Sequence, residues 1–251
     1  MNAHRAHTLA SHNARGHLLA AVALVTLLSA CSVDEALAVK DPKQAQCGDA
    51  PDIHTGRAYY YTTADGTGNC GFDATPNDLM VAAMNTPDYA GSFLCGSSIK
   101  VTGPKGEVVV RIVDRCGGCP KGDIDLSPQA FEKIGELSQG SVVVSWQLVA
   151  SAVTGPIVYH FQTESNQWWT AVQIRNHRYP VATLEYRNRQ GVFTQIERAN
   201  YNYFIASSGL GEGPYTFRVK DIYGHTLVDS LVAHTPGGDV LGKGQFPECG
   251  Q

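Results

Sequence analysis

The sequence predicts an all-β chain of two successive domains, a small closed barrel followed by a β-sandwich. Short β-prone runs recur along the chain, and glycine- and proline-rich turns separate them. A single short amphipathic helix interrupts this pattern, and about 195 residues suffice for two domains of ordinary size. The predicted organisation is an export signal, a tether, a barrel, a linker and a sandwich, over residues 1–30, 31–55, 56–150, 151–156 and 157–248.

The first 30 residues carry signals for export rather than part of the fold. Residues 18–30 form an apolar run that is too short to span a bilayer but suits the core of a signal peptide. The run ends Leu-Ser-Ala-Cys, which is the bacterial lipobox pattern, and Cys31 would then become the lipid-bearing first residue. Ordinary cleavage after residues 36–38 is the alternative. The sequence predicts an exported protein, either a lipoprotein of the cell surface or outer membrane or a freely secreted protein.

The cysteine count agrees with lipidation of Cys31. Seven cysteines are present, and removing Cys31 from the count leaves six, an even number for an oxidising compartment. Cys116 and Cys119 form a CxxC motif that could bind a metal or act in redox chemistry. Because no second such motif accompanies it, a local disulfide is favoured and neither a metal nor an organic cofactor is expected.

The charge of the chain disfavours polyanions as ligands. The formal net charge is −4, and loss of residues 1–30 would remove two arginines and no acids, which makes it −6. Nucleic acid is therefore excluded as a partner, and acidic pectin is disfavoured as the main ligand. Binding would have to depend on stacking and hydrogen bonds.

The barrel is predicted from short strands between clear turns. Residues 64–69, 85–91 and 103–106 are turn segments, and the last of them joins two strands as a hairpin. Because many short strands with one helix leave exposed edges, closure into a barrel is expected. The β-prone runs are residues 58–62, 79–84, 98–101, 108–113 and 142–149.

Residues 107–131 hold the chemistry-bearing part of the barrel. Asp114 lies where a β-branched run ends, and Asp125 precedes Ser127 and Pro128, a cap residue and a proline at the first helical position. Each aspartate alone could serve only to cap a helix or close a turn. Together they predict two carboxylates near one cleft.

The segment DRCGGCPKGDIDLSPQAFEKIG resembles the first domain of expansins, the cell-wall-loosening proteins, and SNQWWTAVQIRNHRYPVATLEY, YNYF and QFPE resemble the second domain of the bacterial group. The resemblance implies a six-stranded double-psi β-barrel and an immunoglobulin-like β-sandwich that binds cellulose. It implies a groove containing Asp125, Asp114 and a threonine, which is Thr62 unless the alignment slips to Tyr61 or Thr63.

The sandwich carries a pair of adjacent tryptophans that predict a sugar-binding surface. Trp168 and Trp169 would point to opposite faces of a strand, so one core ring and one exposed ring is the alternative. Tyr201 matches the third aromatic of the family's platform, whereas Tyr179 and Tyr203 are expected to be structural. The strand-like runs are residues 157–161, 168–175, 182–186, 193–197, 215–220 and 226–231.

The resemblance also implies cysteine pairs and shows departures from the family. It pairs Cys70 with Cys95, while a Cys47–Cys249 bond and the local Cys116–Cys119 bond stay open among the 15 pairings of six cysteines. Cys116 stands where the family often has an aromatic residue, and Gln162 replaces a lysine beside the platform.

The function implied is loosening of plant-type walls by a monomer that binds cellulose or other β-glucans without cleaving them. The family lacks the catalytic base of related hydrolases, although Asp123 is an additional acid nearby. One alternative is a lytic enzyme with Asp125 as general acid, either an endoglucanase or a transglycosylase acting on peptidoglycan. The other is a surface protein that only binds carbohydrate.

Overall fold

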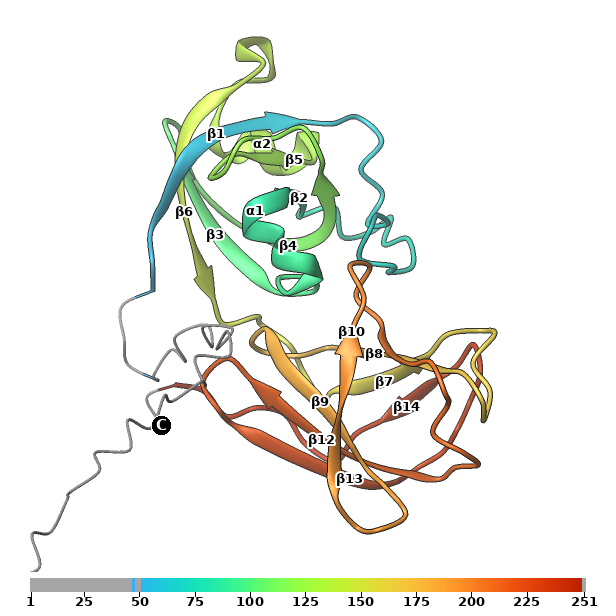
Figure 1. Cartoon of the computed structure of the whole chain (residues 1–251). Helices are drawn as coiled ribbons and strands as arrows, with labels where there is room; N and C mark the ends of the chain where they lie inside the picture. The colour runs from blue at the N-terminus through green and yellow to red at the C-terminus, as the bar shows by residue number, and fades with distance from the viewer. Residues whose placement is uncertain (1–46, 48–50, 250–251) are drawn as a thin grey trace, which may run out of the picture. The chain divides into compact units, whose positions relative to one another are not determined.

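The computed structural model describes Cys47 and residues 51–249, so the expectations for the signal segment and Cys31 lie outside the described residues. A closed six-stranded barrel is followed by eight strands of a sandwich (Figure 1), which confirms the predicted all-β fold class. The barrel strands are β1 (His54–Tyr60), β2 (Val81–Asn85), β3 (Ser98–Gly103), β4 (Gly106–Cys116), β5 (Ile124–Leu126) and β6 (Val142–Val149).

The remaining strands follow in chain order from Val158 to Leu241. They are β7 (Val158–Phe161), β8 (Thr170–Arg175), β9 (Val181–Arg187), β10 (Phe193–Arg198), β11 (Phe204–Ala206), β12 (Tyr215–Asp221), β13 (Thr226–Val232) and β14 (Asp239–Leu241). The helices are α1 (Thr86–Tyr89) and α2 (Pro128–Ile134), with 3₁₀ turns at Ala90–Ser92 and Leu137–Gln139. Among the described residues, no helix is both long and apolar enough to cross a membrane.

The barrel closes in the order β1-β5-β2-β4-β3-β6, with β1–β5 and β2–β4 parallel and the other pairs antiparallel. Alternate residues of each strand point inward, so Ala58, Met84 and Ile124 belong to one buried core. Their sequence neighbours therefore lie on the outer face, where Tyr59, Ala83 and Asp125 are found.

A β-bulge in β4 decides where Asp114 points. Ile112 pairs with Ala82, but the next residue of β2, Ala83, pairs with Asp114, so Val113 is an extra residue. Ile112 packs into the core, and strict alternation would also turn Asp114 inward. Because the bulge shifts the alternation by one residue, Asp114 lies on the outer face with Ala83.

Helix α2 begins as its sequence predicts. The backbone N–H of Ala130 donates to Ser127 Oγ at 3.1 Å, and Pro128 occupies the first helical position. Phe131 and Ile134 are fully buried against the barrel core. Because α2 follows β5 directly, its packing against the core fixes the end of the strand that carries Asp125.

The sandwich strands pair in the order β13-β12-β9-β10-β11-β8-β7-β14. Strand β10 pairs with β9 on one side and with β11 on the other, so it joins the two halves of the sandwich. One apolar core draws on both halves, with Tyr159 and Val172 from one half and Leu184 and Phe217 from the other. The three-residue strands β11 and β14 were not among the predicted runs, because three residues give no readable alternation.

Three disulfide bonds, Cys47–Cys249, Cys70–Cys95 and Cys116–Cys119, match the expected pairs. The first closes a sequence separation of 202 residues and the last a separation of 3. Cys70 and Cys95 are buried in the barrel core.

Arg198 at the end of β10 joins the sandwich to the loop after α1. Its guanidinium lies 5.6 Å from the ring centre of Phe93 and 4.5 Å from that of Phe204. It donates hydrogen bonds to the backbone carbonyls of Val181 and Ser92. Burial lowers the pKa of this guanidinium to about 10, so the contacts hold a cation that has lost much of its hydration.

Candidate functional site

Strand pairing places the two predicted groove acids in one row across the outer face of the barrel. Ala83 of β2 pairs with Asp125 on one side and with Asp114 on the other. Paired residues point to the same face, and two strand spacings separate the two Cα atoms by about 10 Å. The alanine between them is too small to divide the row. Tyr59 of β1 pairs with Asp125 and continues the row.

Asp125 lies in a partly buried position with two other acids nearby. Burial raises the pKa of its carboxyl group, and the charges of Asp123 and Asp114 raise it further. Its carboxylate also lies within 4.8 Å of both sulfur atoms of the Cys116–Cys119 disulfide. A carboxyl group in such surroundings holds its proton more tightly than a free aspartate does, and when protonated it can donate a hydrogen bond to a sugar oxygen.

Asp114 is held as a hydrogen-bond acceptor. Its Oδ1 accepts from the backbone N–H of Asn69 at 2.6 Å and from that of Arg115 at 2.7 Å. Such short charge-assisted bonds fix the orientation of a carboxylate. The Cα of Gly68 passes so close that an added Cβ would lie 2.4 Å from Asp114 Cβ, which explains the glycine at this position.

The three candidates for the third polar residue of the groove, Tyr61, Thr62 and Thr63, differ in their burial. Thr62 and Thr63 lie exposed in the turn after β1. Tyr61 lies near the groove acids. Burial raises the pKa of its phenol, and the charges of Asp114, Asp125 and Asp65 raise it further. Its hydroxyl oxygen is buried and has no hydrogen-bond partner among the described residues. Its hydrogen-bonding capacity is therefore unused in the part of the chain that the structure describes, although the oxygen is shielded from solvent.

Tyr59 and Asp123 were not assigned to the groove by the sequence. Tyr59 is 36% exposed on the face that carries Asp125, and period-two alternation from Tyr61 would have signalled it. Asp123 is mostly buried, and its Oδ1 accepts from the backbone N–H of Arg57 at 2.8 Å. Asp123 therefore stabilises the strand pair that holds Asp125.

The two tryptophans lie in a turn rather than in the strand that the sequence indicated, because β8 begins only at Thr170. The side-chain oxygen of Asn166 accepts from the backbone N–H groups of Trp168 at 2.9 Å and Trp169 at 3.1 Å. This turn leaves the Trp168 side chain 71% exposed and Trp169 half-buried. The alternation argument for opposite faces does not apply there, because a turn has no period of two.

Tyr201 is 42% exposed, whereas Tyr203 and Tyr179 are buried. The rings of Tyr201 and Tyr203 lie 6.1 Å apart, so the buried ring supports the exposed one. Beside Trp168 lies a hollow of about 590 Å³ that is also lined by Arg187, Arg189 and other polar residues.

Asn69 connects the acid row to the loop that carries Tyr201. Its backbone N–H donates to Asp114, and its side-chain amide donates to the backbone carbonyl of Asn200 at 2.7 Å. The hydroxyl of Tyr89 donates to the same carbonyl at 3.1 Å. The position of Asp114 and the position of Tyr201 therefore depend on the same short network.

Two groups of side chains have the spacing of metal ligands among the described residues. They are Cys47, His225 and Cys249, and Cys116, Cys119 and Asp125. All four cysteines form disulfide bonds. Because a metal site needs free thiolates, neither group has the donors of a cysteine metal site.

Comparison with known proteins identifies the family. Residues 53–146 match a family model described as lytic transglycolase. Expansin-YoaJ of Bacillus subtilis (strain 168) is 36% identical over 206 residues, 78% of this chain and 88% of that protein. Expansin-like protein 2 of Dictyostelium discoideum is 32% identical over 212 residues, 80% of this chain and 52% of that protein.

Solved structures give the same answer. The crystal structure of a mutant Clavibacter michiganensis expansin in complex with cellohexaose has a TM-score of 0.73 and 30% identity to this chain. The match covers 78% of this chain and 98% of that one. The apo form of the same expansin matches equally well. By sequence over most of a relative's length and by fold, this chain belongs to the bacterial expansins.

Proposed function

We propose that this chain binds cellulose and related β-glucans and loosens plant-type cell walls without cleaving the polymer. Family membership supports this, and the related Clavibacter protein was crystallised with cellohexaose. The observation that carries the proposal is the Asn69 network, which joins the acid row to the loop of an exposed aromatic residue. One glucan chain can then be held by both surfaces.

The proposed mechanism divides binding between stacking and hydrogen bonding. Trp168, Trp169 and Tyr201 offer ring faces to the apolar faces of glucose units. Asp125 donates to a sugar oxygen, Asp114 accepts from a sugar hydroxyl, and Tyr61 or Thr62 adds a third contact. Because these contacts replace those between neighbouring polysaccharide chains, they weaken the wall network.

The fixed orientation of Asp114 suits a role in sugar binding. Hydrolysis needs a second carboxylate that activates water or attacks the sugar, at about 5–9.5 Å from the acid. Asp114 already accepts two backbone N–H bonds on one oxygen. It is therefore oriented as a fixed acceptor.

A lytic enzyme is the second candidate function. Asp125 supports it, because burial and two neighbouring acids raise the pKa of its carboxyl group, as a general acid requires. The family model over residues 53–146 is also described as lytic transglycolase. The substrate would be a glucan or peptidoglycan, with Asp125 protonating the leaving oxygen.

Creep of a plant wall strip under constant load, with soluble sugar measured in the same bath, separates the candidates. The proposal expects extension without new reducing ends, and loss of extension in Asp125→Asn. Release of reducing ends from cellulose, or of anhydro-muropeptides from peptidoglycan, would establish the lytic candidate instead. Extension that persists in Asp125→Asn, together with loss of binding in the Trp168→Ala Trp169→Ala double variant, would favour the candidate in which the barrel is inert and the protein acts only by binding carbohydrate.

We also propose that the protein is exported as a monomer, with its domains divided as the sequence predicts and Cys31 as the site of a lipid anchor. Mass spectrometry of the protein from membranes, compared with a Cys31→Ala variant, tests the anchor. Full release of the wild-type protein into the medium would contradict lipidation.

A further inference from the structure

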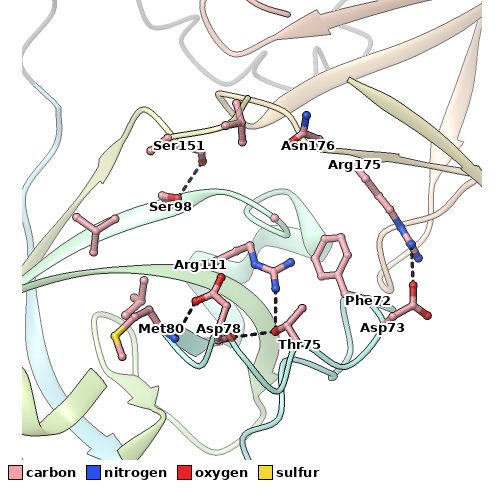
Figure 2. A pocket seen from close by; sticks show the side chains of 15 residues that line it. Phe72, Asp73, Thr75, Asp78, Met80, Ser98, Arg111, Ser151, Arg175 and Asn176 are labelled. Atoms are coloured by element: carbon pink, nitrogen blue, oxygen red, sulfur yellow. Dashed lines mark hydrogen bonds and ion pairs between the residues drawn. The ribbon is translucent and has the colours of Figure 1, made fainter. Parts of the chain in front are cut away.

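A separate pocket lies between the outer side of strands β3 and β4, the loop after β1 and the segment after β6. Its volume is about 560 Å³, within the range of about 300–1,000 Å³ that is typical of small-molecule sites. Figure 2 shows the Arg111 guanidinium inside it, next to Asp78 and Thr75, with the Ser98–Ser151 pair on the other side. None of the groove acids or platform aromatics lines this pocket.

Arg111 is the dominant charge of the pocket. It is half-buried, and burial lowers the pKa of its guanidinium; the charge of Asp78 partly offsets this, and Arg175 lowers the pKa further. Its side chain donates to Thr75 Oγ1 at 3.3 Å, and among the described residues it forms no ion pair within 4.0 Å. A desolvated guanidinium with unused N–H groups is a strong binding partner for a carboxylate.

The second arginine, Arg175, adds positive charge, but several of its N–H groups are already bonded within the protein. Arg175 is bonded to Asp73 at 2.8 Å and to the side chain of Gln173. Both guanidinium groups lie near the ring of Phe72, at 5.2 Å for Arg111 and 5.9 Å for Arg175. Phe72 therefore helps to hold two cations close together, and Arg111, which forms no ion pair within 4.0 Å among the described residues, has more unused donors for an anion.

The rest of the lining suits a sugar ring. Val109, 48% exposed, and Met80 offer apolar contact, and the Ser151 hydroxyl bonds that of Ser98 at 2.9 Å. Hydroxyl groups can donate and accept, as sugar recognition requires. Asp78 lies exposed at the rim, and its Oδ1 accepts from the backbone N–H of Met80 at 3.3 Å.

The geometry points to a binding site for a sugar that carries a carboxylate, a hexuronate unit, with its carboxylate on Arg111 and its ring against Val109 and Met80. This site is independent of the proposed cellulose surface. The acidic balance of the whole chain does not prevent it, because repulsion from distant charges is screened within about 10 Å at 0.1 M salt.

Methyl glucuronide, methyl glucoside and acetate, titrated into the ¹⁵N-labelled protein, test the site by NMR. We expect the glucuronide to change the chemical shifts of backbone amides in the pocket. The glucoside and acetate should not produce these changes at equal concentration. No shift at the pocket, an equal response to the glucoside, or an equal response to acetate would each overturn the inference.

Two substitutions are expected to change glucuronide affinity in opposite directions. A general loss of folding would weaken binding in both variants, so it cannot produce this result. Arg111→Gln should weaken glucuronide binding by about tenfold, because a charge-assisted hydrogen bond is lost. Asp78→Asn keeps the acceptor for Met80 but removes a rim anion, so it should strengthen binding. Arg189→Gln, an equal change of charge beside Trp168, is the matched control and should leave it unchanged. Unchanged affinity in Arg111→Gln, with cellohexaose binding intact, would refute the site.

Discussion

Removal of the exposed tryptophan ring gives the most direct measure of the proposed platform. A tryptophan side chain can bury about 150–250 Å², and 71% exposure of Trp168 leaves roughly 110–180 Å² of that free. A sugar stacked on one face covers about half of this area, and burial contributes about 25 cal/mol per Å². Trp168→Ala should therefore lose about 1.4–2.2 kcal/mol of binding, a decrease of about 10- to 40-fold in affinity.

Calorimetry with cellohexaose and depletion from microcrystalline cellulose both measure this loss. Because the ring is exposed, the free energy of unfolding should change by no more than about 0.5 kcal/mol. Val228→Ala, an exposed apolar residue of β13, is the control and should bind as the wild type does. An affinity of Trp168→Ala within twofold of the wild-type value would refute the stacking argument.

Three further predictions concern stability and are measured by urea unfolding. The native protein binds the Asp125 proton more tightly than the unfolded chain does. The free energy of unfolding therefore falls as the pH rises from the pKa of Asp125 in the unfolded chain to its higher pKa in the folded protein. Asp125→Asn should therefore raise the free energy of unfolding at pH 7 but not at pH 3, and an equal gain at both pH values would contradict the pKa shift. Arg198→Met should cost about 2–4 kcal/mol, because it leaves two backbone carbonyls without their donor. A loss below about 0.5 kcal/mol would mean that water replaces the guanidinium. Loss of the Cys116–Cys119 bond should cost about 2 kcal/mol and loss of Cys47–Cys249 about 5 kcal/mol, because the second closes a far longer loop; the reverse order would show that strain rather than chain entropy decides.

Sequence patterns were sufficient where the physical signal is local. Ser127 and Pro128 mark the start of α2 because capping and a fixed proline φ act within one turn. The long runs of β4 and β6 are strands because five residues of each are β-branched or aromatic, which favours a pleated surface.

The same reasoning failed where a strand is short or where a side chain redirects the backbone. Strand β5, which holds Asp125, has three residues and pairs on both sides only because β1 and β2 are there. The Trp168 turn depends on one amide, that of Asn166, which competes with strand pairing for two backbone N–H groups.

By itself the sequence determined the all-β class and the family, because composition, turns and ordered motifs are properties of the chain. Only the tertiary structure decided that Asp114 and Asp125 flank Ala83, because a bulge and two strand registers set that row. It also decided that Arg111 faces a pocket beside Asp78 and, among the described residues, forms no direct ion pair there. These outcomes depend on contacts between residues far apart in sequence, and no local pattern encodes them.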